Sequence, residues 1–213
     1  MNNPGVGHAP EAILFTSPAC PHCPALKKIL QGLHDSGQLS QLQLHDVNHS
    51  AELAQQLGVR SIPWFRIGEL EFQGLHSAGE LQYWAAHAND AQGILRYISQ
   101  ALEAGQLSSI EKMIHRHPPW LQIAIQLLAD MQAPLSARIG LGAILESLQD
   151  DPILETVLPQ LVAMSQHSDF RVRSDACHYL GLFNNTSARE ALQTRLTDEH
   201  AEVREIARES LEA

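Results

Sequence analysis

Two cysteines separated by two residues form the most reactive pattern of this sequence, Cys20-Pro21-His22-Cys23. A thiolate, and not a thiol, attacks disulfides and binds metals. If the motif opens a helix, the unpaired N–H groups and the dipole of the first turn favour the thiolate of Cys20. Cys23, one turn later, can then attack a disulfide formed at Cys20. The pattern predicts either a redox-active dithiol or part of a metal site.

The other candidate metal ligands favour the redox interpretation. Zinc takes four ligands, typically two C-x-x-C pairs or one such pair with two histidines. The third cysteine, Cys177, stands alone beside Ala176, where we expect it in a packed core. Neither of the close histidine pairs, at 45 and 49 and at 115 and 117, has the spacing of a zinc finger. We therefore expect no metal, and the residues between the cysteines, Pro21 and His22, to tune the redox poise.

The segments around the motif alternate between strand and helix patterns. A short apolar strand over 12–15 runs into the motif, and a helix with an apolar stripe follows over 24–33. The pattern continues with a strand over 41–47, a short helix over 51–57, a hairpin whose strands 64–67 and 70–72 flank Gly68-Glu69, and a helix over 78–87. These elements predict an α/β domain over residues 10–88.

A second feature lies forty residues after Cys23, where Ser61-Ile62-Pro63 precedes a predicted strand. Together with the motif, it resembles the thioredoxin superfamily, in its small glutaredoxin-like members. The resemblance implies a cis bond between Ile62 and Pro63, with the backbone of Ile62 free to pair with an extended substrate segment. Trp64 either lines this substrate groove or is a core aromatic residue of the strand.

The sequence also departs from the family pattern. The family's buried acid, six residues before the first cysteine, is replaced by Leu14, and its tryptophan directly before that cysteine by Ala19. A leucine cannot accept a proton, so the deprotonation of Cys23 must rely on His22, solvent or another group. The Gly-Gly pair that binds glutathione in glutaredoxins is missing over 73–79, which argues against glutathione dependence.

Residues 93–213 show only helix patterns, after a small polar stretch over 89–93 that is typical of a linker or a helix boundary. The pattern V-R-x-x-A-x-x-x-L starts at Val172 and again at Val203, 31 residues later, and a fainter copy starts at Ala137. It resembles the inner helix of HEAT-like repeats of the bilin-lyase type, and we expect an all-α repeat domain over 93–213. An ordinary helical bundle is the alternative. We expect helices over 94–104, 107–115, 119–131, 135–148, 153–166, 170–183, 188–196 and 201–211.

Composition and charge exclude several classes of partner. The formal net charge of −10 argues against nucleic acid, because that binding depends on Lys and Arg that neutralise phosphates. No segment approaches the roughly 20 apolar residues of a membrane span, and residues 1–10 lack the pattern of a signal peptide. We therefore expect a cytoplasmic protein without a membrane partner, although a periplasmic location stays open if a leader was removed.

These observations predict a protein disulfide oxidoreductase in which Cys20 attacks, Cys23 resolves, and Ile62, Pro63 and Trp64 contact the substrate. The cysteine pair would itself be the redox group, with no further cofactor. The expected partners are a protein client carrying a disulfide or dithiol, selected by the repeats, and an electron donor of the thioredoxin-reductase type. The alternative is a redox-regulated binding adaptor in which the HEAT-like domain is the main functional part.

Overall fold

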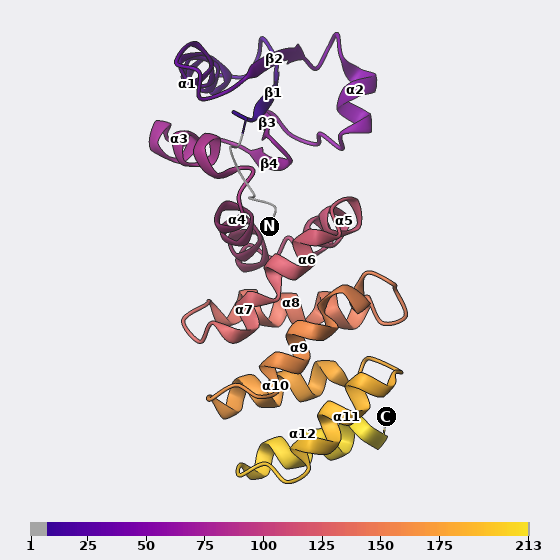
Figure 1. Ribbon diagram of the computed structural model, residues 1–213. Helices are drawn as coiled ribbons and strands as arrows, with labels where there is room; N and C mark the ends of the chain where they lie inside the picture. Colours follow the sequence, from indigo (N-terminus) through magenta and orange to yellow (C-terminus); the bar gives the residue numbers. More distant parts are fainter. Residues whose placement is uncertain (1–7, 213) are drawn as a thin grey trace. The chain divides into compact units, whose positions relative to one another are not determined.

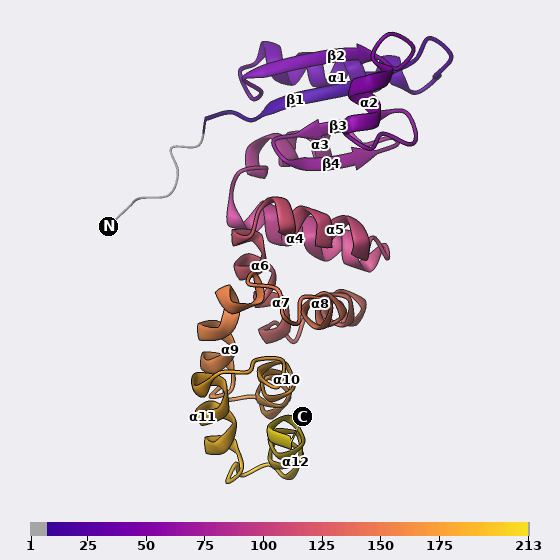
Figure 2. The same cartoon turned by 90° about the vertical axis from the view of Figure 1, so that its right-hand side faces the viewer.

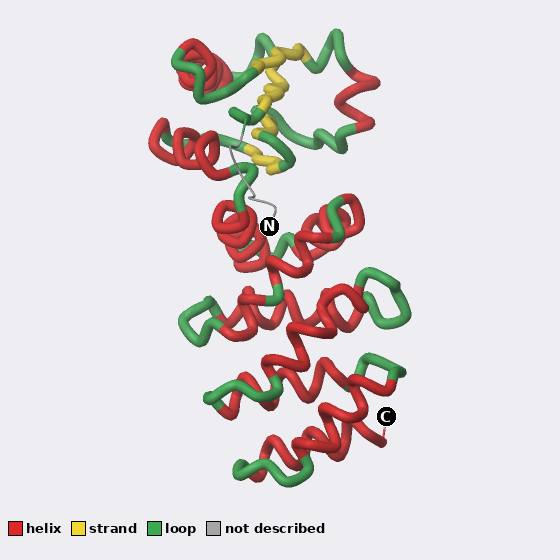
Figure 3. The backbone as a smooth tube through the Cα atoms, viewed as in Figure 1, coloured by secondary structure: helices red, strands yellow, loops and turns green. Residues whose placement is uncertain are grey.

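A computed structural model describes residues 8–212 of the chain (Figure 1). Contacts within the chain divide it into two compact units that meet between Ile94 and Leu95. Strands occur in the first unit, and the described part of the second unit is helical (Figure 3). The predicted combination of a thioredoxin-like α/β fold and an all-α repeat region is confirmed.

The first unit contains one mixed four-stranded sheet. Its elements are β1 (Glu11–Thr16), α1 (Cys23–Asp35), β2 (Gln41–Asp46), α2 (Ala51–Gln56), β3 (Trp64–Ile67), β4 (Leu70–Gln73) and α3 (Ala78–His87). The strand order is β2-β1-β3-β4, with β1 parallel to β2 and antiparallel to β3. The βαβ unit and the hairpin predicted from the sequence are both present.

Helices cover both faces of this sheet, which explains why β1 is apolar without alternation. Helices α1 and α3 lie on one side of the sheet and α2 on the other (Figure 1). Leu26, Leu30 and Leu33 form the buried stripe of α1. On the opposite face, Ile13, Phe15 and Trp64 pack with residues of α2 and its flanking loops. Because β1 is held by strands on both sides, the loop that begins after Thr16 has a fixed starting point at one end of the sheet.

The stretch over 89–93 contains a helix boundary. Helix α4 (Ala91–Glu103) begins inside it, and the side chain of Asp90 accepts a hydrogen bond from the N–H of Gly93 at 2.7 Å. An aspartate at this position satisfies an N–H group that the helix itself leaves unpaired.

The second unit is a series of helices: the remainder of α4, then α5 (Leu107–Arg116), α6 (Pro119–Ala124), α7 (Gln126–Ala129), α8 (Leu135–Ser147), the 3₁₀ helix η1 (Leu154–Val157), α9 (Leu158–Met164), α10 (Phe170–Leu180), α11 (Thr186–Arg195) and α12 (Ala201–Glu212). Two expected helices are each divided. The helix predicted over 119–131 breaks at Ile125, and the one over 153–166 consists of η1 and α9. Pro159, which lacks an N–H group, lies in the first turn of α9, where that group is not needed.

The repeated pattern corresponds to a repeated structure. Helices α8, α10 and α12 form one layer of this unit, and α9 and α11 lie in the other (Figure 2). The apolar residues of the pattern are buried, as shown by Ala137, Val172 and Val203, each at 0% exposure, except for the partly buried Leu211 near the end of α12. The prediction that these positions share an apolar face is confirmed.

The arginine of the pattern has a role that its spacing does not reveal. The Arg173 guanidinium donates from one Nη to the carbonyls of His167 and Ser168, at 2.9 and 3.0 Å. Arg204, 31 residues later, donates in the same way to the carbonyls of Asp198 and Glu199, at 2.7 and 3.1 Å. Each arginine therefore holds the loop that precedes its own helix.

Arg173 also joins two repeats. Its Nε and second Nη donate to the two carboxylate oxygens of Asp198, at 2.9 and 2.8 Å, and both side chains are almost fully buried. Burial alone would raise the pKa of Asp198, but the hydrogen bonds from Arg173 and from the N–H of His200 outweigh it and hold the pKa below its usual value. The pair is therefore fully charged at neutral pH.

Candidate active site

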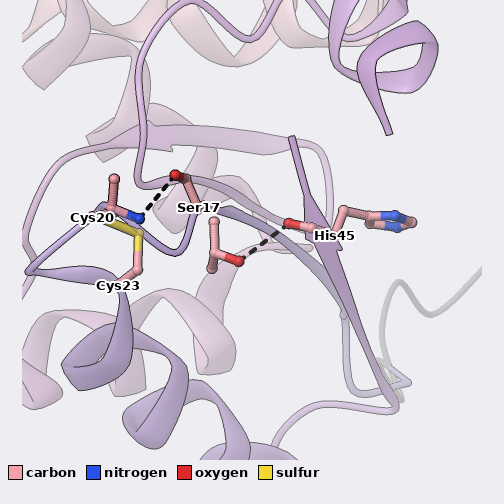
Figure 4. The surroundings of a disulfide bond; sticks show 6 residues. Ser17, Cys20, Cys23 and His45 are labelled. Atoms are coloured by element: carbon pink, nitrogen blue, oxygen red, sulfur yellow. Dashed lines mark hydrogen bonds between the residues drawn. A yellow bond between two sulfur atoms is a disulfide. The ribbon is translucent and has the colours of Figure 1, made fainter. Parts of the chain in front are cut away.

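The two cysteines of the motif are joined by a disulfide bond (Figure 4). Cys23 is the first residue of α1, and Cys20 lies in the preceding turn, where its N–H donates to the Ser17 carbonyl at 3.0 Å. The Cα atoms of the cysteines are 5.6 Å apart. Because the sulfur of Cys20 is bonded to that of the first helical residue, both sulfurs lie at the positive end of the helix dipole.

The two cysteines differ in their access to solvent. Cys20 is partly exposed, whereas Cys23 is only 4% exposed. An incoming thiol or disulfide can therefore approach Cys20, and Cys23 is shielded beneath the turn. The two sulfurs therefore differ in their accessibility to a reaction partner.

Pro21 and His22 lie on the surface between the cysteines. His22 occupies the N-cap position of α1, and its side chain makes no capping hydrogen bond. Pro24, directly after Cys23, has no N–H to satisfy in this first turn. The imidazole of His22 is therefore exposed to solvent at the start of α1, between the two cysteines in sequence.

The Ile62–Pro63 segment reaches the same end of the sheet. Its peptide bond is cis, as expected from the resemblance. In the antiparallel register of β1 and β3, Trp64 pairs with Phe15. Pro63, which directly precedes Trp64, therefore lies at the level of Thr16, at the end of the sheet. The loop that carries Cys20 starts there as well. Pro63 is fixed from its other side by the N–H of Gly74, which donates to its carbonyl at 2.9 Å.

Of the two interpretations of Trp64, its burial favours the core aromatic residue. Its side chain is 2% exposed and meets the Phe15 ring edge-on, with the ring centroids 5.7 Å apart. The side chain of Ile62 packs against the same cluster. Trp64 therefore packs in the core beside Phe15 and Ile62 and offers almost no exposed surface to a substrate.

His45, which its sequence position marked only as a candidate metal ligand, lies next to the strand that leads into the site. Its ring stacks on Phe15 with a centroid distance of 5.2 Å, and its carbonyl accepts a hydrogen bond from the Thr16 hydroxyl at 3.3 Å (Figure 4). Its Nδ1 lies 3.3 Å from the Ser50 hydroxyl. The parallel pairing of the strands predicted over 12–15 and 41–47 could have indicated this contact, since it brings the end of the first strand to the second half of the other. His45 thus ties β2 to the residue that opens the active-site loop.

The position of the family's buried acid is fully apolar here. Leu14 is 0% exposed, and its partners across the sheet are Leu44 and Phe65. No carboxylate of β1 can therefore accept a proton beneath the cysteines.

The remaining cysteine has the opposite character. Cys177 is 0% exposed in α10, and burial raises the pKa of its thiol to about 11. At neutral pH it is a thiol without nucleophilic character. Among the described residues, no group of three or more His, Cys, Asp or Glu side chains could hold a metal ion, and no helix is long and apolar enough to cross a membrane.

Comparison with known proteins agrees with this geometry. A family model described as a thioredoxin domain matches residues 12–86, and one described as HEAT repeats matches residues 119–212. A thioredoxin of Methanocaldococcus jannaschii is 33% identical over 63 residues, which are 29% of this chain and 74% of that protein. These similarities and the Cys20–Cys23 disulfide support a redox role, in general terms that of a disulfide oxidoreductase. The chain belongs to the thioredoxin family, and its thioredoxin domain is followed by HEAT-like repeats.

Proposed function

We propose that this protein exchanges its Cys20–Cys23 dithiol with disulfides of client proteins. The observation that carries the proposal is the unequal exposure of the two sulfurs at the start of α1. In the reduced protein, the Cys20 thiolate attacks a client disulfide, forms a mixed disulfide and releases one client thiolate. The Cys23 thiolate then attacks the sulfur of Cys20, which releases the second client thiolate and leaves the Cys20–Cys23 disulfide.

The surrounding residues act on the two steps differently. The helix dipole and a protonated His22 both favour the thiolate of Cys20, and thus a more oxidising disulfide. Ile62, held in place by the cis bond to Pro63, presents its backbone to an extended client segment at the same end of the sheet. Since Leu14 cannot accept the Cys23 proton, His22, solvent or another group takes it during resolution. No metal, nucleotide or flavin enters these steps, and a thioredoxin-reductase-like donor returns the electrons.

A trapping experiment tests the roles of the two cysteines. Cys23→Ser, combined with Cys177→Ala, should accumulate mixed disulfides with client proteins through Cys20, because attack occurs without resolution. Mass spectrometry of adducts isolated from lysate identifies both partners. The matched control is Cys20→Ser with Cys177→Ala, which keeps only the shielded cysteine and should yield no adducts. Equal trapping by the two variants would contradict the assigned roles.

The direction of electron flow follows from the reduction potential of the cysteine pair. A value near that of thioredoxin, about −270 mV, favours a reductase, and a value near about −120 mV favours an oxidant. Equilibration with glutathione buffers gives this potential. His22→Ala should lower it, because the reduced thiolate loses a stabilising charge.

We further propose that the helical repeats select the client. Contacts remote from the sulfurs would raise the effective concentration of the client at Cys20 without changing its chemistry. A chain ending at residue 94, verified as folded by circular dichroism, should reduce insulin at the rate of the full chain and the trapped client more slowly. An unchanged client rate would refute selection. If the full chain binds the client but reduces neither substrate, the protein is instead an adaptor.

A further inference from the structure

The outer edge of the sheet in the first unit has no partner strand in the described part of the chain. The strand order places β2 at this edge, where it pairs only with β1. Figures 1 and 2 both show β2 as the outermost strand of the sheet. Such an edge presents unpaired backbone N–H and C=O groups, which are a template for another strand.

Two hydrogen bonds show which residues of β2 face outward. The N–H of Val47 donates to the Thr16 carbonyl at 3.0 Å, and the His45 carbonyl accepts from the Thr16 hydroxyl. Val47 and His45 therefore direct their backbone groups toward β1. Since the backbone groups of successive residues point to opposite edges of a strand, those of Leu42 and Leu44 point away from the sheet.

The side chains of β2 do not protect this edge. Its sequence, Gln-Leu-Gln-Leu-His-Asp, contains neither lysine nor proline, the residues that commonly block edge pairing, and its single charged residue is Asp46 at the end. Leu44 is 39% exposed, although it lies next to the core residue Leu14 across the sheet. The edge therefore combines free hydrogen-bonding groups with an exposed leucine.

We propose that β2 pairs with β2 of a second copy of this chain, antiparallel and centred on Gln43. In this register Leu42 lies opposite Leu44 of the partner subunit, and both residues direct their backbone groups into the new interface. Residues directly opposite each other in antiparallel strands point to the same face. The four leucines of the two copies thus form one apolar cluster over the joined sheet.

Other registers fit less well. The outward positions of β2 are two residues apart, so the nearest alternatives shift the pairing by one step of this spacing. One places Leu44 against Leu44 of the partner subunit, with Leu42 against Asp46 of the partner subunit. The other places Leu42 against Leu42 of the partner subunit, with Leu44 against Ser40 of the partner subunit. Each alternative forms one leucine pair across the interface, whereas the proposed register forms two. This self-complementarity is why we assign the edge to a second copy and not to a client peptide.

The expected dimer is weak. One pair of six-residue strands buries less than the roughly 1,600 Å² of a standard stable interface. Each copy also carries a formal net charge of −10, so the two copies repel each other, and salt should strengthen the dimer by screening that repulsion. Dimerisation should therefore depend on both protein concentration and ionic strength.

Sedimentation of the full chain over about a hundredfold range of concentration tests the proposal. The mass should rise from 23.5 kDa toward twice that value. Amide exchange provides a second measurement. The amides of Leu42 and Leu44 should become protected as the concentration rises, whereas those of Gln43 and His45, which point to β1, should be protected at every concentration.

Leu44→Lys should abolish the concentration dependence of both measurements, because it introduces like charges into the interface and removes the leucine cluster. The matched control is Leu135→Lys, the same change at a leucine of α8 that is 68% exposed; it should leave the dimer intact. Unchanged circular dichroism excludes unfolding of either variant. A monomer at all concentrations, protection of Leu44 that does not depend on concentration, or a dimer that survives Leu44→Lys would each overturn the proposal.

Discussion

The two units of this chain place cysteine in opposite environments. In the first unit, Cys20 is partly exposed in a turn before a helix, and Cys23 lies just beneath it at the helix start. In the second unit, Cys177 is inside a helix that packs against its neighbours, and burial raises its pKa to about 11. The same side chain is thus reactive at a helix N-terminus and inert in a repeat core. Burial and the place of the thiol relative to the helix start, and not residue type, account for the difference.

The cores of the two units differ in a related way. The site of the first unit rests on aromatic rings, since Phe15 contacts both His45 and Trp64. The second unit has a mainly aliphatic core with a buried ion pair, Arg173 with Asp198, between successive repeats. A rigid apolar support suits a site whose sulfurs must keep their geometry. A buried ion pair instead penalises wrong pairing of similar helices, because a mispaired repeat leaves a charge unmatched.

The largest difference should appear when one cysteine is removed from each of the two environments. Cys20→Ser should lower insulin reduction by more than about a thousandfold, because the nucleophile acts as part of a unit. Cys177→Ala should leave the rate unchanged, since its thiol is neutral and enclosed. Turbidity assays at equal concentrations of folded protein measure both rates. Appreciable activity of Cys20→Ser would show that another sulfur attacks.

The buried ion pair of the second unit gives the next largest effect. Arg173→Met should reduce the free energy of unfolding by about 3–5 kcal/mol, because Asp198 is left charged and buried. Arg171→Met is the matched control two residues away. Arg171 is exposed, and the loss of its pair with Asp169 should cost far less, because solvent screens an exposed ion pair. Denaturant unfolding measures both; equal losses would show that the Arg173 pair is not desolvated.

Protonation of Asp198 should produce a smaller loss. Its pKa is lowered in the folded protein, so its contribution to stability is complete above the unfolded value of about 3.9 and declines as the pH falls through the folded pKa. The loss should be smaller than that in Arg173→Met, because a protonated carboxyl still accepts hydrogen bonds from the guanidinium. Asp198→Asn should flatten the pH dependence of unfolding in this range. An unchanged acid profile in that variant would assign the transition to other carboxylates.

Sequence patterns predicted the elements of both units because each element has a local signal: the apolar run of β1, the stripe of α1, and the period of the repeats. They also located Cys20, Cys23 and Pro63. The contacts that could not be predicted join residues far apart in the chain, such as His45 on Phe15 and Arg173 with Asp198. Spacing shows that V-R recurs, but only the packing of successive repeats shows what the arginine binds. The face used by Trp64 likewise depends on strand register.

Two glycines should respond to alanine with opposite signs, and this is the smallest expected difference between the units. Gly32, in α1 of the first unit, has nothing within 4 Å of an added Cβ, so Gly32→Ala should stabilise by about 0.5–1 kcal/mol through helix propensity. In α8 of the second unit, a Cβ on Gly142 would overlap the Tyr179 hydroxyl. Gly142→Ala should therefore destabilise, by about 1–3 kcal/mol, because a well-packed core resists added volume. Thermal unfolding of the two variants distinguishes the cases. Stabilisation by both substitutions would show that Tyr179 moves aside freely, and that the repeat core is packed less tightly than the contact of α8 with α10 indicates.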